Sequence, residues 1–223
     1  TEPDPDLKGC FKDLSELRVD VAYPLLLELY DDYTKNILSK NDFISALRLL
    51  ESYVFRRAIC GIPTNSLNKV FSTFSKNLRK DHYLEGMQAH LTLLPSYRKF
   101  PTDEEFSREL QVRDIYNFRN RRYLLRKLEN HHTKEPVNVD NYTIEHILPQ
   151  NPNLSQQWKN SLGPDWKRIQ EQYLHTLGNL TLTGYNSEYG DSSFAQKRDM
   201  AGGFRQSKLR LNNNLGDLTD WDE

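Results

Sequence analysis

Residues 142–150 read Tyr142-Thr143-Ile144-Glu145-His146-Ile147-Leu148-Pro149-Gln150, with strand-forming side chains around an adjacent carboxylate and histidine. Proline cannot donate to a strand ladder, so Pro149 predicts the end of the strand. Neighbouring side chains of a strand point to opposite faces, so Glu145 and His146 share one site only where the strand twists or ends. A neutral imidazole accepts a proton and a carboxylate binds a hard cation. Both functions serve metal-assisted phosphodiester hydrolysis.

A second polar run follows at Gly178–Asn186, which reads GNLTLTGYN. Its alternating residues 180–183 predict another strand, Gly184 predicts a turn, and residues 192–198 predict the start of a helix. The two asparagines of the run offer amide oxygens to a cation, although asparagine is also favoured in turns for its own backbone hydrogen bonds. Strand, long connection, strand, turn and helix predict a ββα arrangement.

The remainder of the chain is predicted to be mostly helical. Before residue 130, apolar side chains recur at helical spacing, and Thr102 with Glu105 forms a capping box. One predicted helix, residues 114–129, carries many basic side chains. A short strand is predicted at Val137–Val139. The expected fold is therefore mainly α with a small α+β part, with a helical domain at 1–133 and a ββα domain at 134–223.

Composition narrows the class of protein. The 223 residues carry a formal net charge of −1, and no apolar run is long enough for a membrane span. Only Cys10 and Cys60 occur, which excludes a disulfide framework and a cysteine-rich zinc site and favours the cytoplasm. The first residue is threonine, so we expect a piece of a longer protein. Residues 197–210 are predominantly basic, which predicts either a phosphate-binding face or a solvated helix face.

Taken together, these motifs resemble those of the HNH nucleases, also called ββα-metal or His-Me finger nucleases. The resemblance is closer to the C-terminal nuclease domain of the GmrSD type IV restriction enzymes and to phage-defence proteins of the BrxU and SspE types. It extends into the helical region and covers most of the chain. The matching runs are Tyr53–Arg57, Arg119–Leu125, Glu145–Gln150, Leu177–Thr183 and Phe194–Lys197, together with Asn186.

The resemblance implies a role for each matching residue. His146 would be the general base, and Asn179 would orient that base or support its loop. Glu145 and Asn186 would hold Mg²⁺ or Mn²⁺. The acidic position is often aspartate in such enzymes, and the longer glutamate here can also reach a metal through water. His175 is expected to have a packing role, although it lies close enough in sequence to Asn179 to reach the site.

DNA is the implied substrate, and Lys197, Arg198 and Arg205 are predicted to contact it. A single site of this type would nick one strand, so a double-strand break would need a dimer or two successive nicks. Relatives carry an upstream nucleotide-hydrolysing sensor module whose motif is absent from this sequence. The expected function is a metal-dependent DNA endonuclease or nickase in phage defence or modification-dependent restriction. The alternative is a non-catalytic helical adaptor that binds DNA or a protein.

Overall fold

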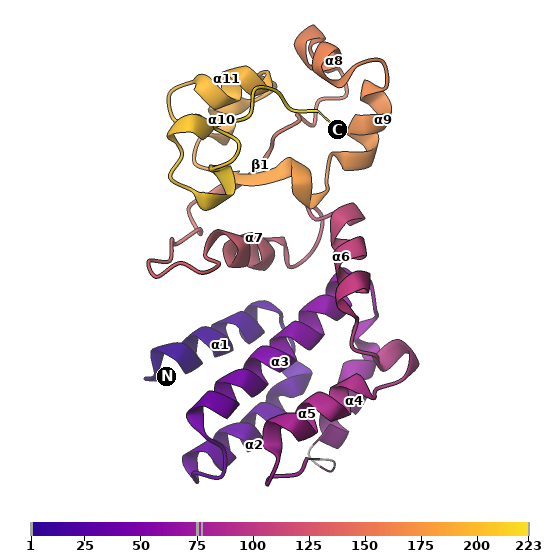
Figure 1. The fold of residues 1–223 in the computed structure, drawn as a ribbon, viewed down its shortest axis with the longest axis vertical. Helices are drawn as coiled ribbons and strands as arrows, with labels where there is room; N and C mark the ends of the chain where they lie inside the picture. The colour runs from indigo at the N-terminus through magenta and orange to yellow at the C-terminus, as the bar shows by residue number, and fades with distance from the viewer. Residues whose placement is uncertain (1, 75, 77, 223) are drawn as a thin grey trace. The chain divides into compact units, whose positions relative to one another are not determined.

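The chain forms two compact units, Thr1–Leu110 and Gln111–Glu223 (Figure 1). The computed structural model describes residues 2–74, 76 and 78–222. Helices dominate, and the sheet of the described residues has two antiparallel strands. This confirms the predicted class, mainly α with a small α+β part. None of the described helices combines the length and apolar character that a membrane crossing requires.

The first unit is built from α-helices joined by short turns. Its α-helices are α1 (Pro5–Glu16), α2 (Tyr23–Thr34), α3 (Lys40–Ile59), α4 (Leu67–Phe74), α5 (Tyr83–Thr92) and α6 (Asp103–Val112), which runs past the unit boundary. Its 3₁₀ turns are η1 (Asp20–Ala22), η2 (Thr64–Ser66) and η4 (Ser96–Arg98).

Side-chain caps fix where several of these helices begin. The carboxylate of Asp4 accepts hydrogen bonds from the first backbone N–H groups of α1, and Ser39 does the same for α3. At α6, the Thr102 hydroxyl accepts from the Glu105 N–H, and the Glu105 carboxylate accepts from the Thr102 N–H. The predicted capping box is therefore confirmed.

The second unit places a small sheet among short helices. Its α-helices are α7 (Arg121–Glu129), α8 (Gln156–Leu162), α9 (Trp166–Tyr173), α10 (Asn186–Tyr189) and α11 (Phe194–Asp199). Its 3₁₀ turns are η5 (Leu177–Asn179), η6 (Phe204–Gln206) and η7 (Arg210–Asn212). Strands β1 (Thr143–His146) and β2 (Leu180–Thr183) pair in an antiparallel ladder, with Glu145 opposite Thr181 and His146 opposite Leu180.

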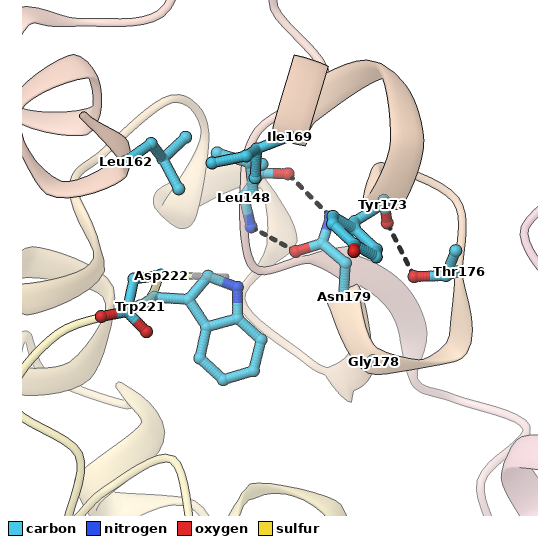
Figure 2. A pocket seen from close by; sticks show the side chains of 9 residues that line it. All are labelled: Leu148, Leu162, Ile169, Tyr173, Thr176, Gly178, Asn179, Trp221 and Asp222. Carbon is cyan, nitrogen blue, oxygen red and sulfur yellow. Dashed lines mark hydrogen bonds between the residues drawn. The ribbon is translucent and has the colours of Figure 1, made fainter. Parts of the chain in front are cut away.

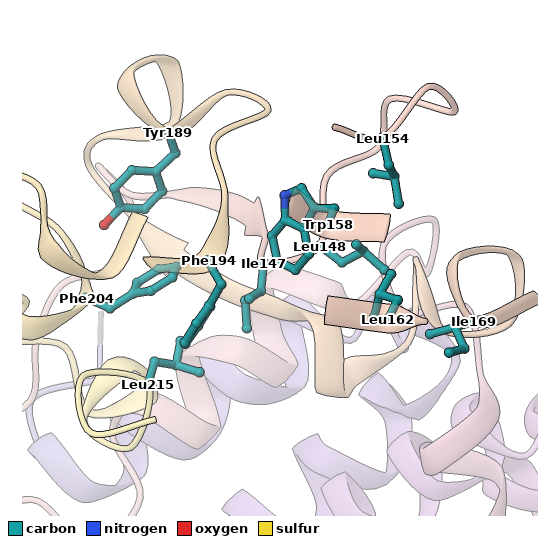
Figure 3. Packing of buried hydrophobic residues seen from close by; sticks show 10 residues of the cluster. All are labelled: Ile147, Leu148, Leu154, Trp158, Leu162, Ile169, Tyr189, Phe194, Phe204 and Leu215. Carbon is teal, nitrogen blue, oxygen red and sulfur yellow. The ribbon is translucent and has the colours of Figure 1, made fainter. Parts of the chain in front are cut away.

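An apolar cluster around the exit of β1 holds this unit together (Figure 3). Ile147 and Leu148 follow β1 directly and are each 2% exposed. They pack in one cluster with Trp158 of α8 and Phe194 of α11. The segment after His146 is therefore fixed by burial as well as by the ladder. A second cluster joins Leu125 of α7 to Leu182 of β2, with Ile144 packed against it.

Two predicted elements differ from the structure. Residues 137–139 are not a strand, because the side-chain amide of Asn130 bonds both the N–H and the C=O of Val137. The predicted helix 114–129 begins only at Arg121. The N–H groups of Ile115 and Tyr116 donate to the main-chain oxygen of His175 instead of to a helical turn.

The two compact units divide between Leu110 and Gln111, whereas the change in sequence pattern predicts a boundary between residues 133 and 134. The segment concerned contains α7, which packs against η7 of the second unit. The Glu129 carboxylate at the end of α7 accepts hydrogen bonds from the N–H groups of Arg210 and Leu211. This helix thus forms part of the same unit as the sheet.

Candidate active site

The ladder sends Glu145 and His146 to opposite faces of the sheet. Ile144 and His146 share the face against which α7 packs, as shown by the contact of Ile144 with the Leu125–Leu182 cluster. Glu145 lies on the other face and reaches Lys197 of α11. Both Glu145 and His146 are 4% exposed. The two side chains predicted to share a site therefore have separate surroundings.

His146 is paired with a second histidine. Its Nε2 lies 3.0 Å from Nδ1 of His175, and the ring of Tyr116 lies edge-on at 4.4 Å between centroids. Burial, together with the charges of His175 and Lys197, lowers the pKa of His146 to about 4, and Asp114 opposes this shift. An imidazole with this pKa is neutral at pH 7 and has a lone pair available for a proton.

His175 is held in place by the segment that precedes α7. Its main-chain oxygen accepts the N–H of Ile115 at 2.8 Å and that of Tyr116 at 3.3 Å. Its ring stacks on Tyr116, with centroids 5.2 Å apart and 14° between the planes. A packing role was expected for His175, with reach to the site as the alternative, and the structure brings it within hydrogen-bond distance of His146. Tyr116 was missed, because no short motif marks it.

Glu145 forms a buried ion pair with Lys197. The Lys197 ammonium donates to Glu145 Oε1 at 2.6 Å, to the main-chain oxygen of His146 at 2.8 Å and to that of Ile147 at 3.1 Å. Burial raises the pKa of Glu145 and lowers that of Lys197, and in each residue the partner's charge opposes the shift. Since Lys197 is 0% exposed, its ammonium is not available to a DNA phosphate in this structure, contrary to the predicted contact.

A sequence signal for the burial of Lys197 does exist. Ser193 caps α11 in a capping box with Gln196, which fixes the start of the helix. Positions three apart share a helix face, so Lys197 lies on the same face as Phe194. Phe194 is 2% exposed, so the helix face that it shares with Lys197 is buried.

Asn179 braces the backbone that follows His146 (Figure 2). Its Oδ1 accepts the N–H of Leu148 at 2.7 Å, and its Nδ2 donates to the oxygens of Leu148 and Leu174. Its own main-chain oxygen accepts the N–H of Ile147 at 3.0 Å. Of the two implied roles for Asn179, this geometry matches support of the loop.

The same residue borders a largely apolar pocket of about 280 Å³. Its lining comprises Leu148, Leu162, Ile169, Tyr173, Thr176, Gly178, Asn179, Trp221 and Asp222 (Figure 2). The amide of Asn179 is committed to main-chain partners, so it leaves the pocket with few polar groups.

Asn186 lies against β1 close to Glu145. Its Nδ2 donates to the main-chain oxygen of Ile144 at 2.7 Å. Within the described residues, Asn186 Oδ1 and Glu145 Oε2 have no hydrogen-bond partner. Carboxylate and amide oxygens suit Mg²⁺, which commonly uses one or two protein ligands and several waters. The described residues contain no group of three or more His, Cys, Asp or Glu side chains able to hold a metal.

The two other residues predicted to contact DNA make internal contacts. Arg198 pairs with Asp199 and donates to the main-chain oxygens of Leu218 and Thr219. Arg205 also pairs with Asp199, and it donates to the main-chain oxygen of Gly216 at 3.1 Å. These two arginines therefore tie the last residues of the chain to α11 and η6.

The sequence model of one protein family, described as the GmrSD restriction endonucleases, C-terminal domain, matches residues 100–223. The match covers more than half of the chain and includes the whole second unit. No curated protein and no solved structure matches the chain.

Proposed function

The chain belongs to the family of GmrSD restriction endonucleases, C-terminal domain, and we propose that it cuts DNA phosphodiester bonds with His146 as general base. Membership makes it a nuclease domain of the restriction endonuclease type. The finer assignment, an HNH-type domain that nicks one strand in phage defence, rests on the motifs and on the geometry around His146. The observation that carries it is a buried histidine at the end of β1, with a lowered pKa and a histidine partner.

The hydrogen bond between His146 Nε2 and His175 Nδ1 can form with either ring as the donor. If His146 Nε2–H donates to His175 Nδ1, the lone pair of His146 resides on Nδ1. That nitrogen would take a proton from water as the water oxygen forms a bond to phosphorus. The bond from phosphorus to the leaving sugar oxygen breaks, and the leaving oxygen takes a proton from solvent. Asn179 and Lys197 would keep the backbone of the base in place through their contacts with residues 146–148.

Glu145 and Asn186 are the residues that would hold a divalent cation, and because Glu145 lies on the sheet face opposite His146, the cation and the base would act from opposite faces at the end of β1. When bound, Mg²⁺ or Mn²⁺ would offset the negative charge that develops on the phosphate. Lys197 occupies one oxygen of Glu145, which leaves the second oxygen for this role.

A plasmid-nicking assay with Mg²⁺ or Mn²⁺ tests the proposal. The unchanged chain should convert supercoiled plasmid to the nicked form, and His146→Ala should lose about 10²–10⁴-fold in rate, as expected for a general base. His82→Ala is the matched control, because His82 is an exposed histidine of the first unit. Equal nicking by His146→Ala and His82→Ala would disprove the role of His146.

A further inference from the structure

The basic residues predicted to contact DNA are engaged in contacts within the chain. Lys197 is buried, and Arg198 and Arg205 are bonded to Asp199 and to main-chain oxygens. A nuclease still needs cations that face the substrate, because contacts with phosphates supply much of the affinity for DNA. Other basic side chains near His146 are therefore the ones to consider.

Three arginines at the start of α7 have no such internal use. Arg119 and Arg122 are exposed and Arg121 is half-buried. None of the three makes a hydrogen bond or ion pair within the described residues, although Arg121 stacks on an aromatic ring. A planar guanidinium binds phosphate through two parallel hydrogen bonds, so free arginines suit a DNA backbone.

The position of these arginines links them to the candidate base. The Arg121 guanidinium lies 5.8 Å from the centroid of the Tyr116 ring, and the same ring lies 4.4 Å from that of His146. Helix α7 also packs on the sheet face that carries His146, through Leu125. Helix α7, which begins at Arg121, and the candidate base therefore lie on the same side of the sheet, and Arg119 and Arg122 are close neighbours of Arg121 in the sequence.

The negative charge in this segment is already engaged. Asp114 is the sole carboxylate between residues 113 and 122. It accepts the N–H of Asn117 at 2.9 Å and its side-chain amide at 2.8 Å. It makes no ion pair with the three arginines, so their charges are left for an external anion.

We propose that Arg119, Arg121 and Arg122 form a phosphate-binding face that holds a DNA strand across Tyr116 and against His146. This rests on the proposed nuclease function and adds the surface that grips the substrate. The face lies before the ββα part of the chain. The alternative, three solvated helix charges, predicts no specific loss of binding when they are removed.

Binding of a short fluorescently labelled DNA duplex, measured by anisotropy over a salt series without divalent ions, tests this face. The triple variant Arg119→Gln, Arg121→Gln and Arg122→Gln should bind at least about tenfold more weakly at low salt. The slope of log K against log salt should fall by about 0.9 for each phosphate that the variant no longer neutralises. The control removes the same charge from three exposed lysines elsewhere, with Lys8→Gln, Lys69→Gln and Lys134→Gln.

The outcomes separate this proposal from the proposed function. The phosphate-binding face is refuted if the triple variant and its control lose affinity equally, if neither loses it, or if the unchanged chain binds no DNA. Nicking is measured in parallel. A chain that binds through the three arginines but never nicks would keep the face and refute the function. If the unchanged chain nicks DNA and the triple variant binds DNA normally, the nuclease function is kept and the phosphate-binding face is refuted.

Discussion

Replacing Lys197 with methionine is expected to remove a large share of the folding free energy of the second unit. The substitution removes the cation that pairs with the buried Glu145, whose side chain is 5% exposed against 0% for Lys197. It also strips a donor from the main-chain oxygens of His146 and Ile147. Removing one partner of a buried ion pair costs about 3–5 kcal/mol, a large share of the roughly 5–15 kcal/mol that stabilises a domain.

The loss should depend on pH through Glu145. Burial raises the pKa of this carboxyl above its ordinary 4.5, and Lys197 is the group that holds it down. Without Lys197 the pKa rises further. A raised carboxyl pKa contributes stability that is present below the unfolded value and is lost as pH rises through the folded value. The deficit of Lys197→Met should therefore be smaller near pH 4.5 than at pH 8.

Tryptophan fluorescence during urea unfolding measures the loss of stability of Lys197→Met in the second unit. Trp158, Trp166 and Trp221 are the three tryptophans of the chain, and all belong to Gln111–Glu223. Lys208→Met is the control, because Lys208 is an exposed lysine of the same unit. A deficit for Lys197→Met below about 1 kcal/mol, within the range of ordinary surface changes, would refute the assigned role of the ion pair.

Three further predictions concern the surroundings of the candidate base. With a pKa of about 4, His146 should sustain nicking at pH 5.5, where an unperturbed histidine would be only about one-tenth deprotonated; a loss of kcat/KM centred near pH 6.5 would contradict this. The same lowered pKa contributes folding stability that is present above about pH 6.5 and is lost as pH falls toward 4, so fluorescence must confirm folding at each pH. His175→Ala should lower kcat with little effect on KM. His175→Asn should recover part of the rate, because the asparagine amide places a hydrogen-bonding atom near the position of His175 Nδ1. Equal rates for the two variants would refute the role of His175 in positioning His146. Asn179→Ala leaves the buried N–H and C=O groups of Leu148 without partners, at a cost of about 1–3 kcal/mol for each group. The free energy of unfolding in urea should therefore fall by more than about 2 kcal/mol, while Asn160→Ala, at an exposed position, should change it little.

Local patterns were sufficient to predict the framework of the second unit. Leu180–Thr183 was predicted as a strand and forms β2, and the strand predicted around Ile144 forms β1. The long connection that was predicted between the two strands is present and contains α8 and α9. These features depend on residues close together in sequence, so periodicity and turn residues report them.

The partners of the candidate site depend on contacts across the chain. The sequence motif identifies His146 and Glu145, but it does not show that His175 contacts His146 or that Lys197 contacts Glu145. Lysine is rarely fully buried, so a basic position in a helix was predicted to lie on a surface. Arg198 and Arg205 were assigned to DNA for the same reason, because charge density alone does not distinguish a free cation from one bonded to the chain's own carbonyls.

Because Asn179 holds the end of β1 against the start of β2, the connection between these two strands can change in length without separating them. Residues 150–174 form most of the connection between β1 and β2. Asn179 keeps the two strands together where this connection begins and ends, because it bonds the N–H groups of Ile147 and Leu148. Loop-closure entropy grows slowly, by roughly 0.6 kcal/mol for each doubling of loop length. Insertions at the turn around Gly163 should therefore be tolerated without displacing the base. Relatives are expected to differ in length there, and a foreign segment grafted at that turn should leave the catalytic end of the hairpin intact.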